Sequence, residues 1–213
     1  MLNYQLPKGL FLLVGLFIST STLAETVSLE YVGFYDRLKQ VNKKNYPLAE
    51  LAFSVPITDD CKILSGNITT ENETFPLTYT KAQRLFIPFD AQLKSDRALV
   101  NINVQGDPTR CAIAMQVRAR STQNQYTQTQ LLALRDDMNR LLDGLQGFPM
   151  KYFRKPIDGM TFEFMSQEMV ITIDGIEQTF ASTFALNNEQ INQLTQISFS
   201  EAPSVVSPLV LNQ

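Results

Sequence analysis

Histidine is absent from this chain of 213 residues. Without an imidazole, the chain cannot form a Ser-His-Asp triad, a Cys-His pair, or a histidine-ligated zinc or haem site. The nine glycines are scattered, and none belongs to a G-x-G-x-x-G or G-x-x-x-x-G-K phosphate-binding pattern. The usual catalytic base and the common nucleotide-binding loops are therefore excluded, and we expect no cofactor and no metal site.

An apolar run long enough to span a membrane is missing from the N-terminal region. Lys8 precedes the apolar stretch Gly9–Ile18, and a small polar run then ends at Ala24. This order is typical of a secretory signal peptide covering residues 1–24. The alternative, an uncleaved anchor, would need about 20 apolar residues. We expect cleavage after Ala24, a mature chain that starts at Glu25, and no remaining membrane span.

An excess of positive charge is also missing. Without residues 1–24 the chain loses only Lys8, which leaves 17 basic against 21 acidic residues and a net charge of −4. General nucleic-acid binders carry a basic excess. We therefore expect a soluble, periplasmic or secreted protein that does not bind nucleic acid.

Cysteine occurs only twice, as Cys61 and Cys111, and both residues lie in the mature part. In an oxidising compartment two cysteines usually form one disulfide. A redox-active pair is the nearest alternative, but the spacing is far from C-x-x-C. A metal site would lack histidine partners. The sequence therefore predicts a structural disulfide.

Strand patterns dominate the first half of the mature chain. Short alternating runs recur about every ten residues between Cys61 and Arg120, with turn residues between them. Ala98–Val104 is the cleanest example, with every second residue apolar. The spacing predicts an α+β fold that is rich in antiparallel strands, arranged as a sandwich or a curved sheet. Met160–Met165 and Met169–Ile173 resemble a β-hairpin.

One long amphipathic helix is predicted at about residues 128–146. Its apolar residues recur at 3-4-3-4 spacing, namely Leu131, Leu134, Met138, Leu141 and Leu145. Thr127 and Gln130 have capping-box spacing, and Gly147 and Pro149 end the pattern. Short helices are expected at Phe34–Val41 and after Asn187. The polar residues before the long helix allow one domain, 25–213, or two packed halves, a β-rich half 25–120 with the disulfide and a half 126–213 with the helix and β-hairpins.

Three pairs of carboxylates are the candidates for acid–base chemistry by paired carboxylates. These pairs are Asp59/Asp60, Glu71/Glu73 and Asp136/Asp137. A catalytic acid needs apolar surroundings that raise its pKa, whereas all three pairs look solvated, with Asp136 and Asp137 on the solvent side of the long helix. We assign no catalytic residue, and a histidine-free hydrolase that acts on glycans stays the alternative.

Aromatic and basic residues are concentrated between Tyr31 and Tyr46. This segment holds three tyrosines, one phenylalanine and four cations in an otherwise acidic chain. Tyrosine and arginine dominate binding hot spots, and clustered lysines suit an anionic surface. The candidate binding residues are Tyr35, Arg37, Lys39 and Lys43. The alternative is a short helix that packs through its apolar residues while its cations are merely solvated.

The same segment resembles the N-terminal signature of a family of exported gammaproteobacterial proteins known as a domain of unknown function. The matching pattern is Y-x-G-F-Y-D-R-L-K-Q-V-N-K-x-N-Y, from Tyr31 to Tyr46. The resemblance implies a bacterial periplasmic location and supplies no activity. We expect a non-enzymatic binding or interaction protein of a Gram-negative envelope, with a protein, glycan or lipid partner.

The disulfide can be tested by mass. We expect the intact mass of protein purified from the periplasm under non-reducing conditions to show no alkylation, because an oxidised pair offers no free thiol. Two alkylatable thiols would mean that the bridge does not form.

Overall fold

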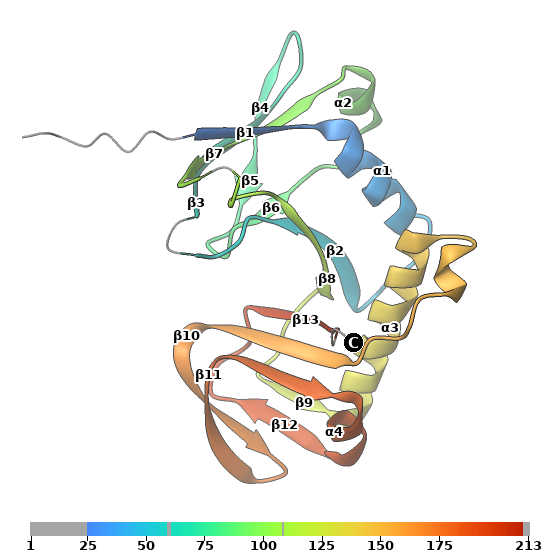
Figure 1. Ribbon diagram of the computed structural model, residues 1–213, viewed down its shortest axis with the longest axis vertical. Coiled ribbons are helices and arrows are strands. Elements are labelled where there is room, and N and C mark those ends of the chain that lie inside the picture. The colour runs from blue at the N-terminus through green and yellow to red at the C-terminus, as the bar shows by residue number, and fades with distance from the viewer. Residues whose placement is uncertain (1–24, 59–60, 108, 211–213) are drawn as a thin grey trace, which may run out of the picture.

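All strand pairings in the computed structural model are antiparallel within the residues that it describes, 25–58, 61–107 and 109–210 (Figure 1). Four α-helices accompany the strands there, and one of them is long. The predicted α+β, β-rich fold is therefore confirmed. The predicted signal peptide lies outside the described residues.

Two four-stranded sheets make up the N-terminal half and curl around a shared interior (Figure 1). In spatial order, the first sheet contains β1 (Glu25–Glu30), β7 (Leu99–Gln105), β3 (Lys62–Thr69) and β4 (Thr74–Pro76). The second contains β5 (Thr78–Tyr79), β6 (Arg84–Phe86), β2 (Ala49–Ser54) and β8 (Ala114–Ala119). Val100, Ile102 and Val104 on β7 are fully buried, as their alternation predicts.

The predicted disulfide joins the two connections that run between these sheets, the one from β2 to β3 and the one from β7 to β8. Cys61 directly precedes β3, Cys111 lies between β7 and β8, and their Cα atoms are 5.5 Å apart. The buried side chain of Gln83 supports this corner, because it accepts from the Ile63 amide at 2.6 Å and donates to the carbonyls of Pro56 and Cys61. The disulfide therefore acts as a structural clamp at one end of the curled half.

The C-terminal half is a five-stranded sheet built on the long strand β10 (Gly159–Ile173). Its other strands are β11 (Ile176–Asn187), β12 (Gln196–Phe199), β9 (Gln125–Thr127) and β13 (Val205–Leu209). The prediction of a hairpin within residues 160–173 is wrong. The residues between Glu163 and Glu168 make a register shift in one continuous strand, and the chain turns at Asp174 and Gly175, both with positive φ.

Helix α3 (Gln128–Gln146) begins and ends as predicted. Thr127 and Gln130 form the capping box, and Gly147 follows the last turn with a φ of 68°. Helix α1 (Tyr31–Val41) starts three residues earlier than the pattern of Phe34–Val41 indicates. Asn187 caps α4 (Asn188–Gln193) as expected, whereas α2 (Ala91–Ser95) was not predicted.

Helix α3 contacts elements of both halves, including α1, β2 and β8 on one side and β9 and α4 on the other (Figure 1). Its residue Asp137 is 3% exposed, so placing it on the solvent side was wrong. One carboxylate oxygen of Asp137 accepts from the amides of Leu48 and Ala49 at 2.8 and 2.9 Å, and the other binds Arg140 at 3.0 Å. This carboxylate fastens α3 to the start of β2.

Strand pairing separates residues 25–119 from residues 125–209 in the described part of the chain. The buried apolar side chains nevertheless form one continuous cluster that includes residues of both halves. The division into one domain or two halves stays a prediction. No helix within the described ranges is long and apolar enough to cross a membrane.

We expect Asp137→Ala to lower the free energy of unfolding by about 2–4 kcal/mol, because it leaves two backbone amides and Arg140 without their acceptor. The neighbouring Asp136→Ala is the matched control, since that side chain is 67% exposed; its change should stay within about 0.5 kcal/mol. Urea denaturation measures both. Equal effects of the two substitutions would contradict the role of the buried carboxylate.

Candidate functional site

The candidate binding residues of the N-terminal segment lie on α1 and in the turn that follows it. Arg37, Lys39 and Lys43 are exposed, as a binding role requires. Tyr35 is half-buried instead: its ring stacks on Phe89 with centroids 4.7 Å apart, and Lys94 Nζ lies 4.8 Å from its centroid. The cations are therefore available at the surface, whereas Tyr35 helps to pack α1 against its neighbours.

A second exposed segment, residues 147–155, was missed by sequence reasoning and is called the aromatic loop below. It contains the short helix η1 (Met150–Tyr152). Phe148 is 82% exposed, Phe153 77%, Tyr152 70% and Met150 57%. Large apolar side chains so exposed and so close together in sequence are unusual in a folded chain. The sequence signal that could have revealed this loop is the cluster of apolar residues directly after Gly147, which ends the long helix.

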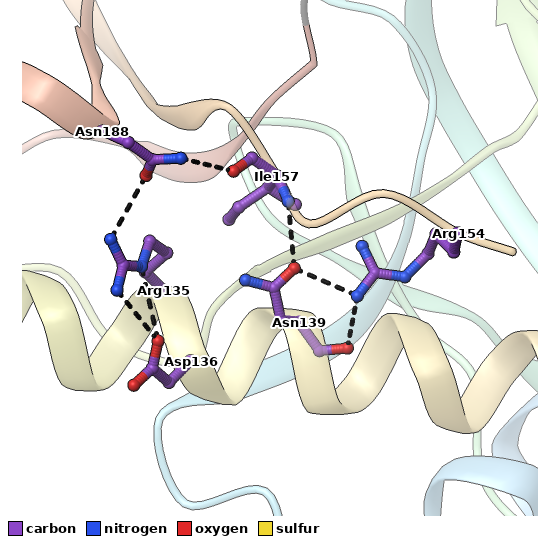
Figure 2. A network of polar contacts seen from close by, with 6 residues as sticks. All are labelled: Arg135, Asp136, Asn139, Arg154, Ile157 and Asn188. Atoms are coloured by element: carbon purple, nitrogen blue, oxygen red, sulfur yellow. Dashed lines mark hydrogen bonds and ion pairs between the residues drawn. The ribbon is translucent and has the colours of Figure 1, made fainter. Parts of the chain in front are cut away.

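Arg154 anchors the aromatic loop to the last turns of α3. Its Nε donates to the Asp143 carboxylate at 2.8 Å, and its Nη2 lies 2.7 Å from the same oxygen. Nη2 also contacts the backbone and side-chain oxygens of Asn139 at 3.1 and 3.0 Å (Figure 2). Hydrogen bonds between a charged guanidinium and a carboxylate are shorter and stronger than those between neutral groups. The loop is therefore held at its C-terminal end.

The polar network continues from Asn139 to the C-terminal half (Figure 2). Asn139 Oδ1 accepts from the amide of Ile157 at 3.0 Å, and Asn188 Nδ2 donates to the carbonyl of Ile157 at 2.8 Å. Arg135 links the same Asn188 to Asp136 on α3. The chain that leaves the aromatic loop is thus tied to α3 and to α4.

The turn after α1 packs against the part of α3 that leads into the aromatic loop. Arg140 donates to the Asn45 carbonyl at 3.0 Å, and its guanidinium lies 5.7 Å from the centroid of the Tyr46 ring. The Tyr46 hydroxyl contacts Gly144, one turn before the aromatic loop begins. Figure 1 shows the end of α1 and η1 at the same edge of the molecule.

We call the combined surface the binding face. It consists of the aromatic loop together with the exposed cations of α1 and the turn after it, Arg37, Lys39, Lys43 and Lys44. The described part of the chain shows no ion pair for these four cations. The face therefore combines exposed apolar side chains with uncompensated positive charge.

A buried charge network lies elsewhere, on β2, β6 and β8. Glu50 is 2.8 Å from Arg84 and 3.5 Å from Arg118, and Glu50 and Arg118 are almost fully buried. Burial and the charge of Arg84 lower the pKa of Arg118. Burial raises the pKa of Glu163 on β10, while the charge of Arg118 opposes that shift. In the sequence Arg118 alternates with the apolar residues Val117 and Ala119, a pattern that favours an exposed side for it, so its burial could not be predicted.

The described members of the carboxylate pairs considered for catalysis are either exposed to solvent or engaged by other groups. Glu71 and Glu73 are exposed, Asp137 is committed to backbone amides, and Asp59 and Asp60 lie outside the described residues. A cavity of about 650 Å³ lies beside the disulfide, and no Asp or Glu is among its described lining residues. No described cluster of three or more Cys, Asp or Glu could hold a metal ion.

The raised pKa of Glu163 predicts a pH-dependent stability. The folded state favours the neutral carboxyl, so ionisation destabilises the fold as the pH rises above about 4.3, the ordinary glutamate value. Glu163→Gln should therefore raise the free energy of unfolding at neutral pH, and the gain should vanish in acid. Urea denaturation against pH measures this, with the exposed Glu168→Gln on the same strand as control. A loss of stability that is equal at both pH values would contradict it.

The comparisons with known proteins concern the part of the chain that contains this face. The family model described as "Protein of unknown function (DUF2987)" matches residues 23–164, which include α1 and the whole aromatic loop. No curated protein and no solved structure matches the chain. The matched segment covers well over half of the 213 residues. The chain therefore belongs to the DUF2987 family of proteins of unknown function.

Proposed function

We propose that the chain is an exported, soluble binding or interaction protein of the Gram-negative envelope and that it is not an enzyme. The observation that carries the proposal is the binding face. Four large apolar side chains, Phe148, Met150, Tyr152 and Phe153, stand in solvent although the chain that presents them is fixed by Arg154. Exposing such side chains costs solubility, and an exposed cluster held in place is typical of a surface that contacts a partner.

The disulfide and the N-terminal sequence support the proposed compartment. A bond between Cys61 and Cys111 would persist in an oxidising environment such as the periplasm. The sequence pattern of residues 1–24 is that of a signal peptide. Both features agree with a protein that works after export, where its partner is an envelope protein, a glycan or a lipid.

The hydrolase alternative has weaker support. Glycoside hydrolysis needs one carboxylic acid and one carboxylate that both face the substrate. The buried carboxylates Glu50 and Asp137 are instead engaged by arginines or backbone amides. Carboxylates held in this way stabilise the fold and offer no free acid or base.

Photo-crosslinking in the periplasm tests the proposal. A photoreactive residue at position 153 should give adducts several-fold more abundant than one at position 176, because Phe153 belongs to the binding face and Ile176 does not. Ile176 is a matched control, since it is 65% exposed at the start of β11. Arg37→Glu combined with Lys39→Glu should reduce the adducts at position 153.

Mass spectrometry of the adducts identifies the partner as protein, glycan or lipid. Equal adduct yields at positions 153 and 176, with no effect of the charge reversal, would contradict a binding role for this face.

A further inference from the structure

We infer that the binding face docks onto a membrane surface that contains anionic phospholipid. The inference rests on the proposed binding function and names the partner of the same face. It is carried by the aromatic loop, by the cations beside it, and by the rigid connection of both to α3.

The side chains of the aromatic loop suit the interfacial region of a bilayer. Phe148 and Tyr152 stand at the tip with ring centroids 6.1 Å apart, and Met150 and Phe153 are exposed beside them. Aromatic rings with an apolar body and, for tyrosine, a polar end concentrate at the level of the lipid headgroups. The loop protrudes from the edge of the molecule (Figure 1). A protruding tip can enter a soft, flat surface without a matching groove.

The cations close to the tip supply attraction to anionic headgroups. Lys151 lies within the loop, with its Nζ 4.9 Å from the centroid of the Tyr152 ring. Lys43 and Lys44 are exposed in the turn that packs against α3. The mature chain as a whole is acidic, so this local positive charge determines which face approaches a negative surface. The nearest carboxylate on α3, Asp143, is neutralised by Arg154.

The rigid base of the loop favours docking without refolding. Arg154 and Asn139 hold the chain that leaves the tip. At the other end, the Gly147 amide donates to the Asp143 carbonyl and the Lys151 amide to the Gly147 carbonyl. A loop already fixed in its bound shape loses little conformational entropy on binding. One short apolar tip with a few lysines gives weak, reversible association rather than permanent anchoring.

Vesicle flotation tests the inference with protein purified from the periplasm. Vesicles of phosphatidylcholine with phosphatidylglycerol should carry the protein upward, and vesicles of phosphatidylcholine alone should carry much less. High salt should weaken the association, because charges at a surface are screened over about 8 Å at physiological ionic strength.

Paired substitutions separate the two parts of the face. Phe148→Ser with Phe153→Ser should lower the apparent affinity for the vesicles about tenfold or more. The double substitution removes most of the apolar surface that the loop would bury in the membrane. Lys43→Glu with Lys44→Glu should lower it several-fold and reduce its dependence on salt. Matched controls are Ile176→Ser for apolar exposure and Lys62→Glu with Lys81→Glu for charge, and both should leave binding unchanged.

The outcomes distinguish this inference from the proposed function. Flotation that needs phosphatidylglycerol and the aromatic loop supports membrane docking, as do lipid adducts at position 153. No flotation, together with a specific protein or glycan adduct at position 153, overturns the inference and leaves the binding function intact. No flotation and no specific adduct overturns both.

Discussion

The buried carboxylate of Asp137 is the interaction on which the rest of the structure depends. A charge taken out of water must be compensated inside the protein, and here two backbone amides at the start of β2 and the guanidinium of Arg140 provide the compensation. This requirement fixes the position of α3 along β2. Because α3 also contacts β9 and α4, the same helix sets how the C-terminal sheet meets the curled N-terminal half.

The residues of α3 that follow Asp137 connect the fold to the binding face. The turn after α1 contacts Arg140 and Gly144. Arg154 of the aromatic loop contacts Asn139 and Asp143. Two segments about a hundred residues apart in sequence are thereby held at one edge of the molecule (Figure 1). The exposed rings thus follow a helix terminus whose other side chains are held by contacts within the fold. These contacts explain how the fold remains stable although the rings are exposed to solvent.

Sequence patterns predicted the helices and strands that depend on interactions between residues close together in the chain. The 3-4 spacing and the capping box located α3, and alternation located β7, because both depend on neighbours within one element. The burial of Asp137 could not be predicted, since its acceptor role depends on amides 88 and 89 residues away. Ser166 and Gln167 suggest a turn before Glu168. In the structure they lie inside β10, where the pairing with β11 shifts register. For the residues of the aromatic loop, the sequence predicts only that the long helix ends there. It does not reveal that their apolar side chains are exposed to solvent.

A single fluorophore tests most directly whether α3 presents the aromatic loop to an anionic membrane. The chain contains no tryptophan, so Phe148→Trp places one reporter at the tip of the loop. Its emission should shift to the blue when phosphatidylglycerol-containing vesicles are added, and Lys43→Glu with Lys44→Glu should diminish the shift. Emission that stays at the wavelength of a fully solvated indole at every vesicle concentration would contradict membrane docking.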